Sequence, residues 1–179
     1  MSVSEDYLSD VASRFRDLKS GADRAIAQVP DEHLFNAIDP ASNSIAVLMQ
    51  HLGGNLRSRW RDFLTTDGEK PDRHRDAEFD APTDPSRAAL VADWESGWRV
   101  LFDELGRLRP EDLTRTVKVR HEPLTVVSAI NRQLLHAAMH IGQIIMLARH
   151  AVPDTWKTLS IPRGQSAAFN EQMKKKHEN

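Results

Sequence analysis

Three histidines have the spacing from which a metal site can be built. His136 and His140 lie four positions apart in LLHAAMHIGQIIMLAR, and His51 lies far upstream in AVLMQHLGGNLRSRW. Because four residues make slightly more than one helical turn, the first two project from the same side of a helix. If the helix that carries His51 packs alongside, three imidazoles converge. Three neutral nitrogens with a fourth position open are typical of a catalytic transition-metal site.

Four amphipathic segments supply the elements that must position these histidines. Apolar residues recur at steps of three and four within residues 8–29, 45–63, 91–108 and 127–145. We expect the first helix to end at Pro30, the second to run from Ser42 or Asn43 to near Asp67-Gly68, the third from Asp84-Pro85 to Pro110, and the fourth to begin at Thr125. A short helix should follow from about Gln165. The pattern predicts an all-α fold, a four-helix bundle with long crossover loops and a short C-terminal helix, as a single domain over residues 1–179.

The two connections that precede the third and fourth helices are not simple loops. Residues 68–85 are charged and interrupted by prolines. The segment RTVKVRHEPLT alternates apolar and polar residues around Val117 and Val119. This alternation predicts a short extended pair, too short to make a sheet.

Composition narrows the classes of function. The 179 residues carry a formal net charge of −2, which argues against a nucleic-acid partner. No apolar run reaches the length of a membrane span, and MSVSEDYLSD lacks the features of a secretory signal, so we expect a cytoplasmic protein with no membrane partner. The sequence has no cysteine, which excludes disulfides, Cys-ligated zinc and iron–sulfur clusters. A metal must therefore be held by histidines, carboxylates and water.

The histidines lie beside the apolar stripes of their helices rather than opposite them. His136 and His140 share a polar stripe with Gln143, and His51 shares one with Asn55. Side chains at such positions face a cleft between helices, where partial burial lowers the pKa of an imidazole and favours its neutral form. Asn55 and Gln143 each follow a histidine by about one turn and are candidates to orient an imidazole or a bound water.

Other interpretations of the histidines stay open. An H-x-x-x-H pair also arises by chance, and a half-buried histidine commonly just hydrogen-bonds a neighbour. A helical interaction module without metal is therefore an alternative. His121 with Glu122, in the loop before the fourth helix, could supply other ligands, as could His74 or His150.

Several stretches are similar to a known family: HLGGNLRSRWRDFLTTDGEK, RHRDAEFD, LLHAAMHIGQIIMLAR and WKTLSIPRGQSAAFN. They resemble the DinB-like superfamily of metal-binding four-helix proteins, and most closely a bacterial branch of unknown function. The resemblance implies that His51, His136 and His140 bind a divalent transition metal, nickel or zinc first and manganese or iron as alternatives. It also implies a bundle that is frequently a homodimer.

The chemistry available to a His-only site is that of a Lewis acid, which can ionise water or an incoming thiol. Hydrolysis also needs a general base, and without an H-E-x-x-H motif the loop residue Glu122 is the one catalytic candidate. Some DinB-like relatives are thiol S-transferases, and thiol transfer requires less of the protein. We expect a divalent-metal-binding protein that acts on a small molecule as a hydrolase or thiol transferase. The alternative is a non-catalytic metal- or ligand-binding protein, or a dimeric stress-response protein.

Arginines follow His51 at positions 57, 59 and 61. Arg59 lies eight residues beyond His51, about two turns along the same face, where its planar guanidinium could hold an anionic group of a ligand. The alternative is that these arginines pair with Asp62, Glu69, Asp72 and Asp76 and pin the long loop. We favour this second interpretation for Arg57 and Arg61 and leave Arg59 open.

Overall fold

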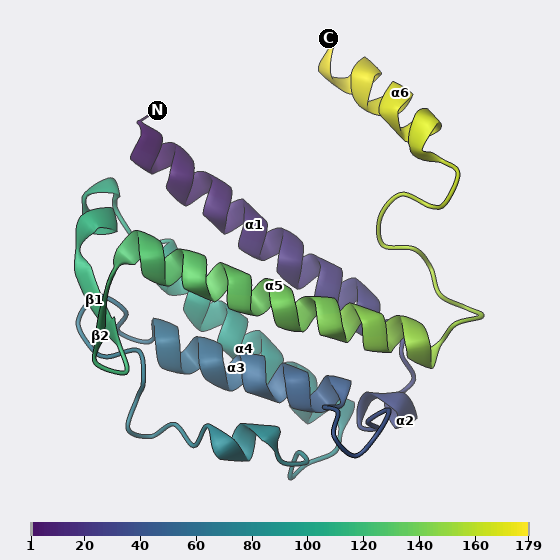
Figure 1. The fold of residues 1–179 in the computed structure, drawn as a ribbon, viewed down its shortest axis with the longest axis horizontal. Helices are drawn as coiled ribbons and strands as arrows, with labels where there is room; N and C mark the ends of the chain where they lie inside the picture. The colour runs from purple at the N-terminus through teal and green to yellow at the C-terminus, as the bar shows by residue number, and fades with distance from the viewer. Residues whose placement is uncertain (1, 179) are drawn as a thin grey trace.

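The computed structural model describes residues 2–178, and most of them are helical. The helices are α1 (Val3–Ile26), α2 (Asp31–Leu34), α3 (Ile45–Trp60), α4 (Arg87–Leu105), α5 (Val126–Ala151) and α6 (Ser166–His177), with short 3₁₀ segments η1 (Asp76–Phe79) and η2 (Pro110–Thr114). Two strands, β1 (Thr116–Val119) and β2 (Glu122–Thr125), precede α5. Figure 1 shows the four long helices running alongside one another, with the η1 segment in the loop outside α3.

The packing of the long helices makes α3 and α5 neighbours, which the convergence of the histidines requires. Helix α3 packs against α4 and α5, and α1 packs against α5 and α4. Their apolar faces enclose one core whose centre is aromatic. Phe15 meets Trp60 and Trp98 edge-on, with ring centroids 6.1 and 6.4 Å apart, and all three side chains are fully buried.

Side-chain caps fix the starts of three long helices. The hydroxyls of Ser44, Ser86 and Thr125 accept hydrogen bonds from the backbone N–H of the third residue of α3, α4 and α5. Each cap contributes about 1 kcal/mol to helix stability. The predicted start at Thr125 is confirmed, whereas α3 and α4 begin one or two residues later than predicted.

The predicted end of the second long helix is wrong. Helix α3 stops at Trp60 because Arg61 is extended and Asp62 has a φ of 51°, a left-handed conformation that no helix continues through. Phe63 nevertheless reaches the core and stacks on Trp60, with ring centroids 4.7 Å apart. The apolar pattern therefore continues to Phe63, although the helix ends at Trp60.

The strands correct the expectation of an all-α chain. β1 and β2 pair antiparallel, with Val117 opposite Leu124, and form a small two-stranded sheet where an isolated extended pair was expected. Arg120 and His121 form the turn with φ values of 54° and 65°, as two-residue hairpins require. The Asp67 carboxylate accepts hydrogen bonds from both backbone N–H groups, at 2.8 Å each. The hydrogen bonds to Asp67 thus stabilise a left-handed turn in which neither residue is glycine.

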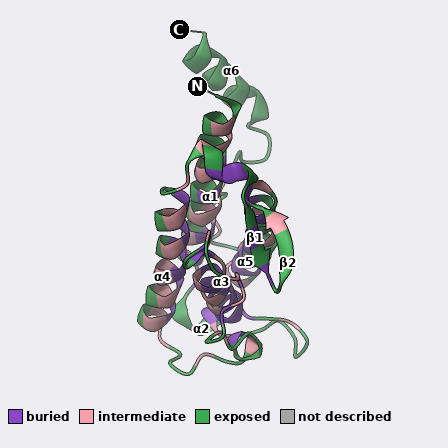
Figure 2. Ribbon diagram, turned by 90° about the vertical axis from the view of Figure 1, so that its left-hand side faces the viewer, coloured by how far each residue is buried: buried purple, intermediate pink, exposed green. Residues whose placement is uncertain are grey.

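The C-terminal helix begins where the sequence predicts, with Gln165 as its N-cap, but it adds nothing to the core. None of its residues is buried, and Figure 2 shows α6 in the exposed colour along its length. Among residues 2–178, none of the helices combines the length and apolar character that a membrane span requires.

Candidate metal centre

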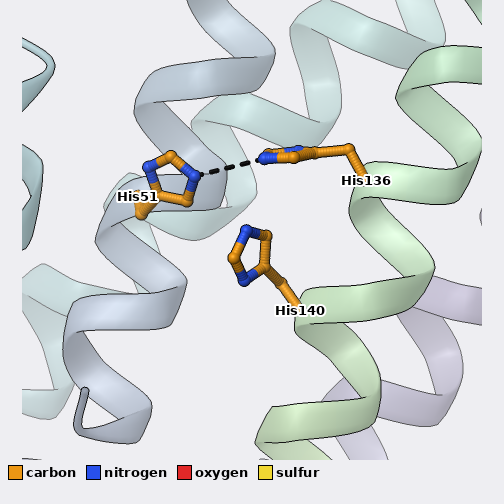
Figure 3. Close-up of side chains that lie close together, drawn as sticks. All are labelled: His51, His136 and His140. Atoms are coloured by element: carbon orange, nitrogen blue, oxygen red, sulfur yellow. Dashed lines mark hydrogen bonds between the residues drawn. The ribbon is translucent and has the colours of Figure 1, made fainter. Parts of the chain in front are cut away.

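Three imidazoles from two helices point toward one another. His51 comes from α3, and His136 and His140 come from successive turns of α5 (Figure 3). One ring nitrogen from each lies within 4.8 Å of the other two, close enough to hold one metal ion. The Nε2 atoms of His51 and His136 are 3.3 Å apart.

This separation fits the nitrogen ligands of a transition metal. Two imidazole nitrogens at 2.0–2.1 Å from a tetrahedral ion lie about 3.3 Å from each other. His51 and His140 are buried, and His136 is partly buried. The donor set and its geometry therefore suit a divalent ion with room for one further ligand.

Hydrogen bonds at Nδ1 of His51 and His140 orient the two rings so that each Nε2 is left for a metal ion. His51 Nδ1 lies 2.9 Å from Oε2 of Glu78, and His140 Nδ1 lies 2.8 Å from Oε1 of Gln143. Because carboxylate and amide oxygens accept, each Nδ1 donates and each Nε2 keeps its lone pair for a ligand position. The predicted role of Gln143 in orienting an imidazole agrees with this contact.

Glu78 is held firmly in its place behind His51. Arg73 donates from Nε and Nη2 to the two carboxylate oxygens, at 2.7 and 2.8 Å. Burial alone would raise the pKa of Glu78, but the hydrogen bonds from Arg73 and His51 outweigh it and lower that pKa. Glu78 is therefore an ionised acceptor. A Cβ on Gly54 would lie 2.5 Å from Glu78 Oε1, so glycine at this position makes room for the carboxylate.

Burial keeps the imidazoles of His136 and His140 neutral. The pKa of His136 is lowered to about 3, first by burial and then by the neighbouring His140 and His51. Burial also lowers the pKa of His140, although the hydrogen bond with Gln143 acts in the opposite direction. Both rings are therefore in the form that binds metal at neutral pH, as their positions beside the core stripes predict.

A cavity of about 410 Å³ opens beside the three histidines. Its walls come from α3, the long loop, the hairpin and α5. Besides the histidines it is lined by Asn55, Arg59, Trp60, Phe63, Arg73, Arg75, Phe79, Val119, Arg120, Ala129, Arg132, Gln133 and Met139. Asn55 and Arg59, both predicted to lie near the site, are among them.

A family model described as "Protein of unknown function (DUF1572)" matches residues 2–165. The chain belongs to the DUF1572 family. The match spans the three histidines, Glu78, Gln143 and the hairpin, and it ends immediately before α6. None of the curated proteins compared with the chain matches it.

The DUF1572 fold does not bring the alternative ligands to the centre. Glu122 accepts a hydrogen bond from Arg132 at 2.7 Å and does not line the cavity. His121 is exposed beside Asp67, and His74 lines a different cavity. His150 lies near the far end of α5, more than two turns beyond His140.

The three arginines that follow His51 divide between the two interpretations. Arg61 pairs with Asp72 of the loop, as expected, at 2.6 Å. Arg57 instead pairs with Asp93 of α4, so the expectation that it pins the loop is wrong. Arg59 binds Glu69 and the carbonyl of Gly68, as the loop-pinning interpretation expects. It also lines the cavity, and a contact with an anionic group there stays a prediction.

The sequence pattern does not single out Glu78 or Arg73. They lie in a loop without periodicity, and only the folded loop brings Glu78 to His51. One signal was present in the Gly53-Gly54 pair, which begins two residues after His51, since adjacent glycines within a helix indicate that something approaches closely.

Proposed function

We propose that this DUF1572 protein is a divalent-metal-binding member of the DinB-like superfamily. In this proposal the four long helices form the four-helix bundle of that superfamily, and His51, His136 and His140 hold the ion. The observation that carries it is the 3.3 Å approach of two Nε2 atoms from different helices, with His140 beside them. Nitrogen-only ligands favour nickel or zinc over manganese or iron.

The residues of the cavity suit a small molecule rather than a macromolecule. A divalent ion would supply Lewis acidity there and could ionise a thiol or water. No Asp or Glu lines the cavity within the described chain, and Glu78 is committed to His51 and Arg73. Hydrolysis would lack a protein base, so we favour transfer of a small-molecule thiol over hydrolysis.

Metal content tests the ligand assignment directly. Protein purified without an affinity tag should contain close to one equivalent of nickel or zinc by elemental analysis. His51→Ala, His136→Ala and His140→Ala should each lose most of it, while His121→Ala and His150→Ala keep it. Circular dichroism would show that the variants are folded. Near-stoichiometric metal in a folded His140→Ala variant would overturn the assignment.

A second assay addresses the reaction. Electrophilic dyes would be offered with a low-molecular-weight thiol to the metal-loaded protein, with and without chelator. Turnover that follows metal content supports the transferase proposal. Full metal occupancy without turnover would favour a non-catalytic metal- or ligand-binding protein.

We also propose a homodimer formed through the outer face of α5. Leu135, Met139 and Met146 lie on one face of this helix and are 72%, 57% and 60% exposed. A second copy would remove this apolar face from water. Analytical ultracentrifugation should find a dimer that Leu135→Lys shifts to monomer, and a monomeric unsubstituted protein would contradict the proposal.

A further inference from the structure

Arginines make up much of the lining of the cavity beside the histidines. Five guanidinium groups line it: Arg59 of α3, Arg73 and Arg75 of the long loop, Arg120 of the hairpin turn and Arg132 of α5. No carboxylate lines it among residues 2–178. Segments distant in sequence thus bring charge of one sign to one small space.

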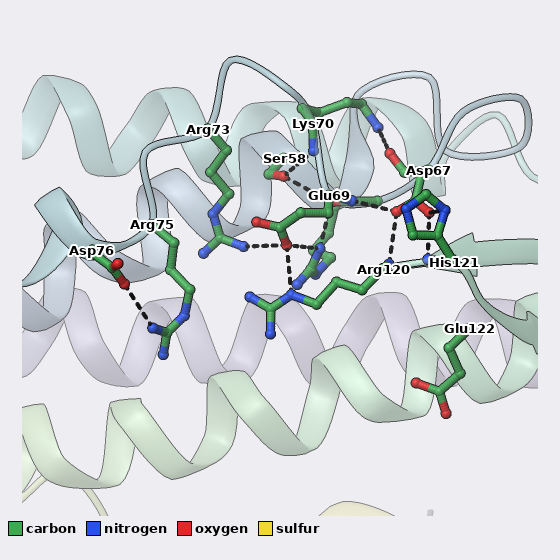
Figure 4. Close-up of polar contacts among 12 residues, drawn as sticks. Ser58, Asp67, Glu69, Lys70, Arg73, Arg75, Asp76, Arg120, His121 and Glu122 are labelled. Carbon is green, nitrogen blue, oxygen red and sulfur yellow. Dashed lines mark hydrogen bonds and ion pairs between the residues drawn. The ribbon is translucent and has the colours of Figure 1, made fainter.

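The acidic partners of these arginines leave them incompletely neutralised. One oxygen of Glu69 accepts from Arg59 at 2.8 Å, from Arg120 at 3.1 Å and from Arg73 at 3.4 Å (Figure 4). Arg73 also binds Glu78. Three guanidinium groups therefore share two carboxylates, which leaves one positive charge.

The two remaining arginines have only exposed partners. Arg75 pairs with Asp76 at 3.4 Å and Arg132 with Glu122 at 2.7 Å, and both carboxylates are solvent-exposed. Exposed pairs of this kind hold their side chains weakly. Both guanidinium groups are therefore available to a ligand in the cavity.

The positions of Arg75 and Arg120 suit them to bind a ligand in the cavity. The Arg75 guanidinium lies 5.0 Å from the Phe79 ring, and Phe79 in turn lies 4.5 Å from the His51 ring. Arg120 binds Glu69 through Nε alone, which leaves its two terminal nitrogens without a partner among the described residues. Its backbone is kept in the left-handed region by the contacts from Asp67.

Two buried amides lining the cavity have unpartnered polar atoms. Asn55 and Gln133 are each 6% exposed, and Oδ1 of the first and Nε2 of the second have no hydrogen-bond partner. Native proteins leave few buried polar atoms unsatisfied. These two atoms, one acceptor and one donor, are available to a polar ligand in the cavity.

We propose that the cavity binds a small molecule through an anionic oxygen group, a carboxylate or a phosphate, held by Arg75, Arg120 and Arg132. The fork of each guanidinium matches such oxygens, and the residual positive charge favours them. The cavity is continuous with the histidines, so the rest of the molecule reaches the metal centre. This last step rests on the proposed function, whereas the anion site stands on the arginines alone.

Calorimetric titration with succinate, with inorganic phosphate and with the neutral succinamide tests the proposal on the intact protein. We expect succinate or phosphate to bind with 1:1 stoichiometry and succinamide not to bind. Which anion binds more tightly distinguishes a carboxylate from a phosphate ligand. Arg132→Gln and the double variant Arg75→Gln/Arg120→Gln should each weaken binding at least tenfold. Arg107→Gln changes an exposed arginine that pairs with Glu104 and does not line the cavity, so it should leave anion binding unchanged.

Metal content measured on the same samples separates this proposal from the previous one. Arginine variants that keep full metal but lose the anion support the anion site. Anion binding by metal-free protein would also support it, even if the metal assignment fails. If neither anion binds the metal-loaded protein, or if both bind Arg132→Gln and the double variant as tightly as the unsubstituted protein, the anion site is refuted. The assignment of the metal ligands would not be affected by that outcome.

Discussion

At the scale of single residues, the centre depends on a carboxylate that no spacing rule indicates. Glu78 accepts a hydrogen bond from His51 and is itself clamped by Arg73. A charged acceptor fixes the tautomer of the imidazole and raises its basicity toward a metal. The three histidines were predictable because their positions follow helical periodicity. Glu78 was not, because its place is set by the fold of a loop.

Glu78→Gln tests this dependence. The amide is nearly the same size but uncharged, so the imidazole of His51 would be held less firmly and would be less basic. We expect metal affinity to fall about 10- to 100-fold while stoichiometry is kept. Competition against a chromophoric chelator measures the affinity. Glu122→Gln, which alters a carboxylate outside the cavity, is the control, and equal affinities in the two variants would contradict the role of Glu78.

The neutral state of His136 predicts how the metal-free protein responds to acid. Its pKa is about 3 when folded and 6.5 as a free side chain, so the unfolded chain binds more protons between these values. Stability is therefore complete above pH 6.5 and falls as the pH drops toward 3. From pH 7 to pH 5 we expect a loss of about 1 kcal/mol from this residue, allowing for its partial exposure.

Urea denaturation of metal-free protein at the two pH values measures that loss, and His136→Gln should reduce it. Keeping the pH at or above 5 avoids the range in which Glu78 loses its own stabilising contribution, since its pKa is lowered from 4.5. An equal decline in the unsubstituted protein and the variant would show that other groups cause it.

At the scale of elements, the glycines of α3 explain why this helix can carry the site. A Cβ on Gly97 of α4 would lie 2.7 Å from the Cα of Gly53, so the two helices cross at close range. The next residue, Gly54, faces Glu78 instead. Adjacent glycines therefore serve two neighbours, the helix on one side and the loop carboxylate on the other.

Alanine at these positions should separate packing from metal binding. Gly54→Ala would displace Glu78 and weaken metal affinity about tenfold, whereas Gly97→Ala would force α3 and α4 apart and lower the free energy of unfolding by about 1–3 kcal/mol. Gly142 of α5 has open space around it, so Gly142→Ala should raise stability by about 0.5–1 kcal/mol. Denaturation curves and metal titrations of the three variants provide the comparison. Unchanged affinity in Gly54→Ala would exclude the proposed role of that glycine.

Helix positions could be predicted from the sequence where local chemistry fixes them, and could not where distant contacts do. The hydroxyl of Thr125 marks the start of α5 correctly. The end of α3 is set by Asp62, whose left-handed conformation is local but is not revealed by the apolar pattern. The hairpin depends on Asp67, which is 53 residues from Arg120 in sequence. Such long-range hydrogen bonds leave no periodic signal.

At the scale of the whole molecule, the centre lies between two helices that the chain connects through the long loop, α4 and the β1–β2 hairpin. His51 on α3 and His140 on α5 are 89 positions apart, and an ion bound by both can be held only while the helices remain packed. Metal that binds the folded state alone stabilises it by about 2.7 kcal/mol at a free concentration one hundred times the dissociation constant.

Metal removal should therefore lower the melting temperature. For a chain of this length each kcal/mol corresponds to about 2–4 °C, so the chelator-treated protein should melt about 5–10 °C below the loaded one. Differential scanning calorimetry of both forms measures the shift. In His136→Ala the two curves should nearly coincide because one ligand is missing, whereas His121→Ala should retain the full difference. A shift of equal size in His136→Ala would mean that the stabilising ion binds elsewhere, since loss of a ligand from the site between α3 and α5 could not leave its linkage to folding unchanged.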